Sequence, residues 1–240
     1  MTELDAGLSV RAFFTSRNGG ASEGPYAGLN VSFAVGDDSE TVAENRKTVA
    51  RLAGAPTAYM SQVHGATVAV VLDASDAPEA DAIITTTPGL ALAVAVADCV
   101  PILAHELTSG AVAAIHAGRR GVEAGVVGAA IAALRGAAPG DAVIEASVGP
   151  AICGACYEVP LEMREAVALV VPQARATSAW GTPSLDLGAA VEAQLRAAGV
   201  ERVHRVGGCT RESPDLYSHR RDGVTGRFAG VIRCETRPSQ

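Results

Sequence analysis

Two histidines and one cysteine stand out as reactive side chains in an apolar sequence. His64, Cys99 and His116 each adjoin a hydrophobic stretch, and both histidines lead into glycine-containing loops. Loops carried by a rigid scaffold expose reactive groups, so these positions are candidates for a site. Two imidazoles and one thiolate would bind a zinc ion and leave its fourth position open, which is the pattern of a catalytic zinc. A water in that position would become acidic near neutral pH.

The same three side chains allow two other interpretations. Cys99 could act as a nucleophile, with His116 or His64 as its general base. All three could instead be packed structural residues, because cysteine is among the most buried residue types in proteins. The intervals between them match no recognised metal-binding signature, so residue type and spacing leave the three interpretations open.

A second pair of cysteines lies further along the chain. Cys153 and Cys156 form a single C-x-x-C motif, whereas a zinc ribbon needs a second pair, and the sequence shows none. A thioredoxin-like redox pair would follow a strand and open a helix, but Pro160 separates this pair from the next predicted helix. We therefore expect loop packing here rather than a redox or metal role.

Arginines in glycine-rich loops are candidates for binding an anion. Arg17 lies in one such loop, and Arg120 precedes a predicted helix whose free N–H groups could also face an anion. A guanidinium group adds bidentate contacts to a phosphate or a carboxylate. Arg220 and Arg221 form a further cluster, and solvated loop charge is the alternative interpretation for each of these arginines.

The elements that must position these residues alternate irregularly along the chain. We expect strands at 10–15, 81–86, 90–97, 100–105, 111–116, 142–148, 201–206 and 228–234, with two short strands within 59–72. We expect helices at 39–52, 122–134, 161–171 and 186–198. The near-continuous apolar runs at 90–97 and 100–105 are typical of strands covered on both faces. Strand pairs between helices predict an α+β fold with mixed sheets.

Composition limits the class of protein. The 240 residues are 48% hydrophobic and 19% charged, which suits a packed globular chain. A net charge of −7 argues against a nucleic-acid partner, since phosphate backbones need a basic surface. We expect no secretory signal and no membrane-spanning segment. Five cysteines, an odd and modest number, favour a reducing cytoplasm.

An ordered set of short motifs spans nearly the whole chain. The motifs occupy residues 14–20, 28–30, 37–38, 45–46, 62–65, 81–82, 97–101, 116–118, 120–121, 149–152, 209–210, 218–223 and 225–227. In this order they resemble the YfiH-type, or laccase-domain, purine nucleoside phosphorylases. The resemblance implies one catalytic domain over residues 1–240, a YfiH-like sandwich of mixed β-sheets layered with helices.

The resemblance also implies a metal and an activity. It makes His64, Cys99 and His116 the ligands of the family's zinc ion, although copper could occupy the same ligands adventitiously. It implies phosphorolysis of adenosine, inosine and methylthioadenosine, with adenosine deamination alongside. The expected partners are a purine nucleoside and phosphate, and we expect no protein partner, nucleic acid or membrane.

Further catalytic roles follow from this chemistry. Zinc deaminases use a carboxylate to carry a proton, and Asp98 is the nearest candidate in the sequence. Phosphorolysis needs cations that hold phosphate, for which Arg17 and Arg120 are our candidates. One position departs from the family pattern, because Arg119 stands where the family usually has tryptophan. Arg119 could stack on a base or bind an anion instead.

Two rival activities remain. A laccase needs about ten histidines for its copper centres, since imidazole is the usual copper ligand. The five histidines of this chain cannot supply them, which opposes the family's older label of copper polyphenol oxidase. A cysteine-type hydrolase or amidase that edits peptidoglycan precursors would use Cys99 as its nucleophile and need no metal.

Overall fold

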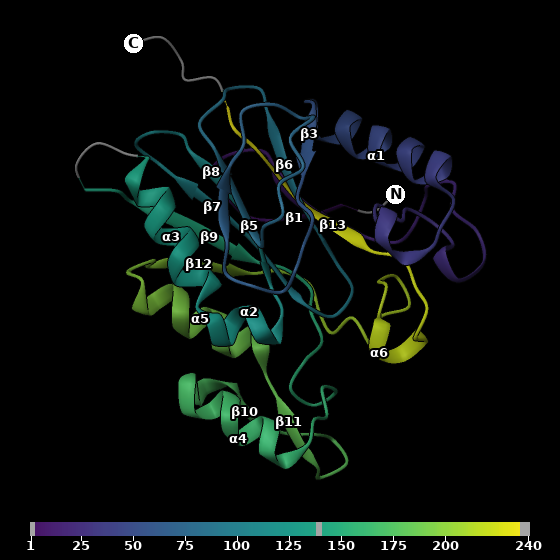
Figure 1. The fold of residues 1–240 in the computed structure, drawn as a ribbon, viewed down its shortest axis with the longest axis vertical. Helices are drawn as coiled ribbons and strands as arrows, with labels where there is room; N and C mark the ends of the chain where they lie inside the picture. The colour runs from purple at the N-terminus through teal and green to yellow at the C-terminus, as the bar shows by residue number, and fades with distance from the viewer. Residues whose placement is uncertain (1–2, 138–140, 236–240) are drawn as a thin grey trace.

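Two β-sheets packed face to face form the centre of the structure, a computed structural model that describes residues 3–137 and 141–235. The five-stranded sheet has the strand order β1-β2-β13-β6-β3, and the six-stranded sheet has the order β12-β9-β7-β8-β5-β4. Helix α1 covers the outer face of the first sheet, and α2, α3 and α5 cover the outer face of the second (Figure 1). Both sheets mix parallel and antiparallel pairs, which confirms the expected fold class.

The strands of the two sheets are short to medium in length. They are β1 (Glu3–Asp5), β2 (Ala12–Thr15), β3 (Thr57–Tyr59), β4 (Val68–Val70), β5 (Ala82–Thr85), β6 (Ala91–Val96), β7 (Val100–Glu106), β8 (Val112–Ala117), β9 (Ile144–Val148), β12 (Arg202–Arg205) and β13 (Phe228–Arg233). The helices are α1 (Ser39–Ala53), α2 (Arg119–Ala124), α3 (Val126–Gly136), α4 (Leu161–Val170), α5 (Leu187–Ala197) and α6 (His219–Asp222). A separate hairpin of β10 (Arg175–Thr177) and β11 (Pro183–Leu185) packs with α4 at the end drawn lowest in Figure 1.

Alternating side chains of each strand fill two different hydrophobic layers. In β2, Phe14 packs between the two sheets, whereas its neighbour Phe13 packs on the α1 side. In β7, Leu103 packs between the sheets and Ile102 packs toward α3 and α5. Because successive side chains of a strand point to opposite faces, only a continuous apolar run can serve both layers. The expectation that such runs form strands covered on both faces is confirmed.

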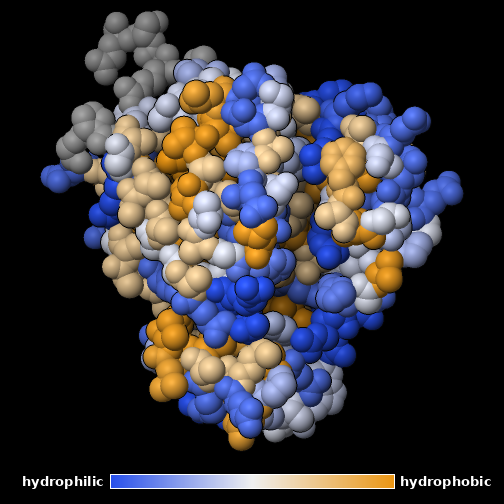
Figure 2. All heavy atoms as spheres, in the orientation of Figure 1, coloured by the Kyte–Doolittle hydropathy of each residue, from blue (hydrophilic) through white to orange (hydrophobic). Residues whose placement is uncertain are grey.

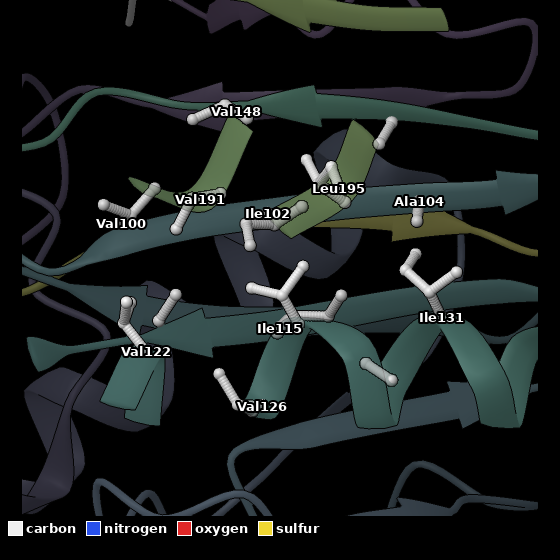
Figure 3. Packing of buried hydrophobic residues seen from close by; sticks show 14 of the residues in the cluster. Val100, Ile102, Ala104, Ile115, Val122, Val126, Ile131, Val148, Val191 and Leu195 are labelled. Atoms are coloured by element: carbon white, nitrogen blue, oxygen red, sulfur yellow. The ribbon is translucent and has the colours of Figure 1, made fainter. Parts of the chain in front are cut away.

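The outer layer of the six-stranded sheet is an aliphatic core. Ile102 and Ile115 come from the adjacent strands β7 and β8, and they meet Val126 and Ile131 of α3 and Leu195 of α5 (Figure 3). These side chains are at most 1% exposed. Burying each large aliphatic side chain contributes about 1.5–3 kcal/mol relative to its exposed state, so this layer holds β8 firmly against the helices.

The predicted helix at 122–134 is wrong as a single element. The chain forms α2 and then α3, and Gly125 separates them with a φ of +82°. Gly125 accepts this left-handed backbone because it has no Cβ, and its N–H caps the last turn of α2 by donating to Gly121. The carbonyl of Gly125 in turn accepts from Ala129 in α3. An alanine-rich pattern hides such a break, because both helices share the same apolar spacing.

The surface carries several exposed hydrophobic side chains, some of them close together in the sequence. Figure 2 shows hydrophobic residues grouped at the upper left and at the lower end over α4, with hydrophilic residues between the two groups. At the end of α4, Leu169 is 87% exposed and its neighbour Val170 is 57% exposed. Among residues 3–137 and 141–235, every helix is too short or too polar to cross a membrane.

The packing between the sheets requires glycine at position 149. A Cβ added to Gly149 would overlap the ring of Phe14, which is fully buried. We expect Gly149→Ala to lower the free energy of unfolding by about 1–3 kcal/mol, as overpacking does in other cores. Gly128→Ala is the matched control, because Gly128 lies within α3 with open space around it, and alanine there should stabilise by about 0.5–1 kcal/mol. Urea unfolding measures both variants, and equal effects would contradict the assignment.

Candidate metal centre

The structure brings His64, Cys99 and His116 together at one end of the sandwich. His64 lies on the connection from β3 to β4, and Cys99 on the connection from β6 to β7, so each lies where the chain crosses between the two sheets. His116 lies near the end of β8. One donor atom from each residue lies within 4.8 Å of the others. The distance from Cys99 Sγ to His64 Nε2 is 4.0 Å, and the two imidazole rings meet edge-on at 4.7 Å.

Unusual backbone geometry accompanies both crossings. Among the described residues, His64 and Asp98 are the non-glycine residues with positive φ, at +60° and +90°. Such conformations cost free energy and persist only where surrounding contacts enforce them. The His64 N–H donates to Asp81, and the Asp98 carboxylate accepts from the Thr210 hydroxyl, each contact holding one crossing in place.

Gly118 lies against all three candidate ligands. A Cβ added there would lie 2.9 Å from Cδ2 of His64 and 3.2 Å from Sγ of Cys99, with His116 close behind. The space over Gly118 therefore exists only because the side chain is absent. Two imidazoles and one thiolate around such a space fit a zinc ion, which takes these donors in tetrahedral geometry and keeps one position for water or substrate.

Asp81 is the residue that orients the cluster. Its carboxylate is fully buried, and one oxygen pairs with Nδ1 of His116 at 2.8 Å while also accepting from the His64 N–H at 2.9 Å. The second oxygen accepts from the Gly65 N–H at 2.6 Å. With Nδ1–H donated to Asp81, His116 presents Nε2 as its metal donor. Our sequence reasoning noted Asp81 only as part of a motif, since its contact with His116 depends on the pairing of β5 with β8.

The charges of Cys99 and His116 support each other. Burial opposes the thiolate of Cys99, but hydrogen bonds with His116 and His64 outweigh it and lower the pKa of Cys99 to about 6. Burial also opposes the imidazolium of His116, but hydrogen bonds with Asp81 and Cys99 raise the pKa of His116 to about 9. Both shifts favour a thiolate beside an imidazolium when no metal is bound. The thiolate is the form that binds metals or attacks electrophiles.

A cavity of about 380 Å³ opens beside His64. Its wall includes Phe33, which is 48% exposed, and the guanidinium of Arg46, which lies 4.3 Å from that ring and 3.8 Å from the ring of Tyr59. Arg227 also lines the cavity. The cavity thus combines aromatic surface, two cations and a candidate metal ligand, which suits a small anionic or aromatic molecule.

Arg227 connects this cavity to the cluster electrostatically. Burial lowers the pKa of Arg227, and the negative charges of Cys99 and Asp98 offset that effect in part. Its Nη1 donates to the carbonyls of Thr225 and Gly226, which fixes the guanidinium in place. Sequence reasoning missed Arg46 and Arg227 as site residues, although both belong to the motifs that carry the resemblance.

Asp98 directly precedes Cys99, but its carboxylate is already engaged. One oxygen accepts from Thr210 Oγ1 at 2.6 Å, and the other accepts from the Arg220 N–H at 2.6 Å. The structure therefore places Asp98 at the junction of three loops beside the cluster. Its part as a proton carrier stays a prediction.

The arginines selected from the sequence lie outside the cavity wall. Arg17 donates to the carbonyl of Ala27, and its guanidinium lies 4.8 Å from the ring of Tyr217. Arg120 is exposed on α2. Arg119, which stands in place of the family tryptophan, forms an ion pair with Glu123 one helical turn further on.

Comparison with known proteins places the chain in a family. A family model described as multi-copper polyphenol oxidoreductase laccase matches residues 11–235. The chain belongs to this laccase-domain family. A protein named purine nucleoside phosphorylase from Streptomyces coelicolor is 51% identical to the laccase-domain chain over 226 residues, covering 91% of this chain and 93% of the relative. The predicted family resemblance is confirmed.

Solved structures of the laccase-domain family share the fold. A crystal structure of a Neisseria meningitidis protein matches with a TM-score of 0.87 at 36% identity, covering 98% of this chain and 99% of the other. YlmD from Geobacillus stearothermophilus matches with a TM-score of 0.86 at 32% identity, covering 96% of this chain and 94% of the other. The layered sandwich is therefore shared by this chain and both solved structures.

The buried contact between Asp81 and His116 yields a prediction about metal affinity. Asp81→Asn keeps the shape of the side chain but removes the charge that fixes the imidazole, so zinc affinity should fall by about 10–100-fold. Competition with a coloured chelator measures the affinity. Glu79→Gln, at an exposed acid two residues earlier, is the control and should bind zinc as the unaltered chain does. Unchanged affinity in Asp81→Asn would contradict the orienting role.

Proposed function

We propose that this chain is a zinc-dependent purine nucleoside phosphorylase acting on adenosine, inosine and methylthioadenosine, with adenosine deaminase activity alongside. The observation that carries the proposal is the position of His64, which belongs both to the three-donor cluster and to the wall of a cavity lined by cations. Further support comes from relatives named purine nucleoside phosphorylase at 51% and 48% identity.

His64, Cys99 and His116 would hold the zinc ion in this proposal. Bound zinc supplies Lewis-acid chemistry, which polarises an oxygen or nitrogen of the substrate or of water. Asp81 holds His116 in the tautomer that leaves Nε2 free for the metal. The donor set suits zinc better than magnesium or calcium, which prefer oxygen ligands.

Phosphorolysis exchanges one bond to the sugar for another. An oxygen of hydrogen phosphate forms a bond to the anomeric carbon, and the carbon–nitrogen bond to the purine breaks. The proton that hydrogen phosphate gives up ends on the ring of the leaving purine. Arg46 and Arg227 are the cations of the cavity that would hold phosphate for this attack, and Phe33 offers an aromatic face to the base. Arg17 and Arg120 remain candidates from the sequence alone.

Deamination needs water to add at C6 of adenine and ammonia to leave, so a proton must move from the water to the departing nitrogen. Asp98 is the proposed carrier, because it neighbours Cys99 and its carboxylate shares a hydrogen bond with the Thr210 hydroxyl. A hydroxyl both donates and accepts, so this pair can pass a proton between them.

The remaining features proposed for this chain concern its setting. We propose one catalytic domain over residues 1–240, with a purine nucleoside and phosphate as its partners in a reducing cytoplasm. Cys99, Cys153, Cys156 and Cys209 are thiols outside any disulfide, which fits such a compartment. The net charge of −7 disfavours nucleic acid as a partner.

A cysteine-type hydrolase that edits peptidoglycan precursors is the second candidate. The observation that favours it is the chain of contacts from Cys99 to His116 to Asp81, which provides a nucleophile, a base and an orienting carboxylate. The lowered pKa of Cys99 fits this chemistry as well as it fits metal binding. The two candidates differ in whether activity needs the metal.

Multi-copper oxidation has less support. His105 pairs with Glu145 at 3.1 Å, and His219 contacts the carbonyl of Gly223, so both lie apart from the cluster. Among the described residues, which include all five histidines, the candidate metal groups contain only His64 and His116. A copper ion in place of zinc would be an adventitious occupant.

The first prediction from this proposal concerns the products. With zinc bound and phosphate present, adenosine should give adenine and ribose 1-phosphate, whereas inosine formation should not depend on phosphate. Cys99→Ala should lose both the metal and both activities. Cys234→Ala should keep them, because Cys234 directly follows β13 and belongs to neither candidate metal group. Chromatography with metal analysis measures each. Full activity without metal would contradict the zinc proposal, and hydrolysis of cell-wall amides without nucleoside turnover would favour the hydrolase.

The second prediction separates the arginines. Arg227→Gln should raise KM for phosphate by about tenfold or more, because a hydrogen bond to a charged group contributes about 1.5–3 kcal/mol. Arg17→Gln should leave KM for phosphate within about twofold of its original value, since Arg17 lies outside the cavity wall. Steady-state kinetics with varied phosphate decides between them. A larger increase in KM for phosphate in Arg17→Gln than in Arg227→Gln would indicate that Arg17 is the residue that binds phosphate.

A further inference from the structure

A second group of metal-binding side chains lies outside the candidate centre. The cysteine cluster consists of Cys153, Cys156, Cys209 and Glu212, whose donor atoms all lie within 4.8 Å of one another. Cys153 and Cys156 come from the loop between β9 and α4, and the other two come from the loop between β12 and α6. Sequence reasoning expected loop packing at Cys153 and Cys156, because it saw no second pair.

The second pair is present, with glutamate in place of its last cysteine. Cys209 and Glu212 have the same spacing as Cys153 and Cys156. Each pair closes a backbone turn, since the Cys156 N–H donates to the Cys153 carbonyl at 3.0 Å and the Glu212 N–H donates to the Cys209 carbonyl at 3.2 Å. The two turns face each other, and the Cys153 N–H donates to Sγ of Cys209 at 3.4 Å.

Two of the three thiols in the cysteine cluster are almost completely buried. Cys156 and Cys209 are 4% and 9% exposed, and they pack with Ile152 in a small hydrophobic group of their own. Cys156 Sγ lies 3.4 Å from Oε1 of Glu212. A disulfide would use two of the three sulfurs and leave the third thiol and the carboxylate facing each other, whereas one cation satisfies all four.

We propose that these four side chains bind one structural zinc ion. Three thiolates and a carboxylate complete a tetrahedral shell with no position left for substrate, which is the pattern of a structural site. Thiolate donors select zinc over harder cations. A Zn–S distance of about 2.3 Å places tetrahedral donors roughly 3.8 Å apart, so the loops need to close by about 1 Å at most.

The proposed ion would support the candidate centre without touching it. Thr210 follows Cys209 and donates its hydroxyl to Asp98 at 2.6 Å, while the Ile152 N–H donates to the Asp98 carbonyl at 3.0 Å. The Thr210 N–H also donates to the Ala151 carbonyl at 3.1 Å. The two loops that the ion joins are therefore the loops that hold Asp98, the residue beside Cys99, in its strained conformation.

Metal counting on the purified chain tests this site separately from the proposed activity. Elemental analysis should find two zinc ions per chain. Cys209→Ser should keep one, having lost the ion of the cysteine cluster, and Cys99→Ala should keep one, having lost the ion of the candidate centre. Cys234→Ser is the matched control, since its buried sulfur belongs to neither cluster, and it should keep two. One zinc in the unaltered chain and none in Cys99→Ala would overturn the proposal, whatever the enzyme assays show.

A milder substitution and a spectroscopic readout cover the case in which the cysteine variants fail to fold. Glu212 is exposed, so Glu212→Gln should fold while its zinc affinity at this site falls tenfold or more, and Glu212→Cys should restore it. The Cys99→Ala chain loaded with Co²⁺ should still show thiolate-to-cobalt charge-transfer absorption. The double variant Cys99→Ala/Glu212→Gln should show weaker absorption at the same Co²⁺ concentration. Unchanged affinity in Glu212→Gln, or a disulfide within the cluster in the isolated chain, would overturn the proposal.

Discussion

The arrangement of the candidate centre depends on one buried carboxylate. Asp81 is shielded from water, and a charge in that position is costly unless several donors surround it. It meets that requirement by joining the ring of His116 to the backbone of the loop at His64 and Gly65. The same contacts that satisfy the charge therefore fix the loop against the strand. The position of the histidines and the stability of the loop therefore depend on the same contacts. If either histidine moved, the buried carboxylate of Asp81 would lose a hydrogen-bond donor.

The sandwich determines where such a centre can form. Hydrophobic side chains on both faces of β6 and β7 bind these strands into separate sheets, so the segment between them must cross from one sheet to the other. The crossing is short and places Asp98 and Cys99 at the end of the sandwich with a strained backbone. The sheets supply the free energy that holds this conformation, and the loops on either side supply the hydrogen bonds that select it.

The sequence patterns predicted the layers, whereas the grouping of the three donors was expected only from the family resemblance, and the residues that support the group were not predicted. Apolar runs marked the central strands, and the types of His64, Cys99 and His116 suggested their chemistry. The role of Asp81 was not predicted, because its contact with His116 depends on the pairing of β5 with β8. Glu212 was not predicted as a ligand, because a search for C-x-x-C motifs does not consider a glutamate in place of the second cysteine. Gly125 divided a helix whose apolar spacing runs on unbroken, and Arg46 and Arg227 reach their cavity through tertiary packing that spacing does not encode.

The two crossings that carry His64 and Cys99 have a mechanical consequence. Each crossing is anchored in both sheets, so the separation of these two donors measures how the sheets sit against each other. An ion bound by both His64 and Cys99 would link the two sheets. Its binding would stabilise the native packing of the sheets by an amount that grows with the logarithm of the free ion concentration. Substitutions deep between the sheets, far from any ligand, would then alter metal affinity, and metal depletion would loosen the interface itself.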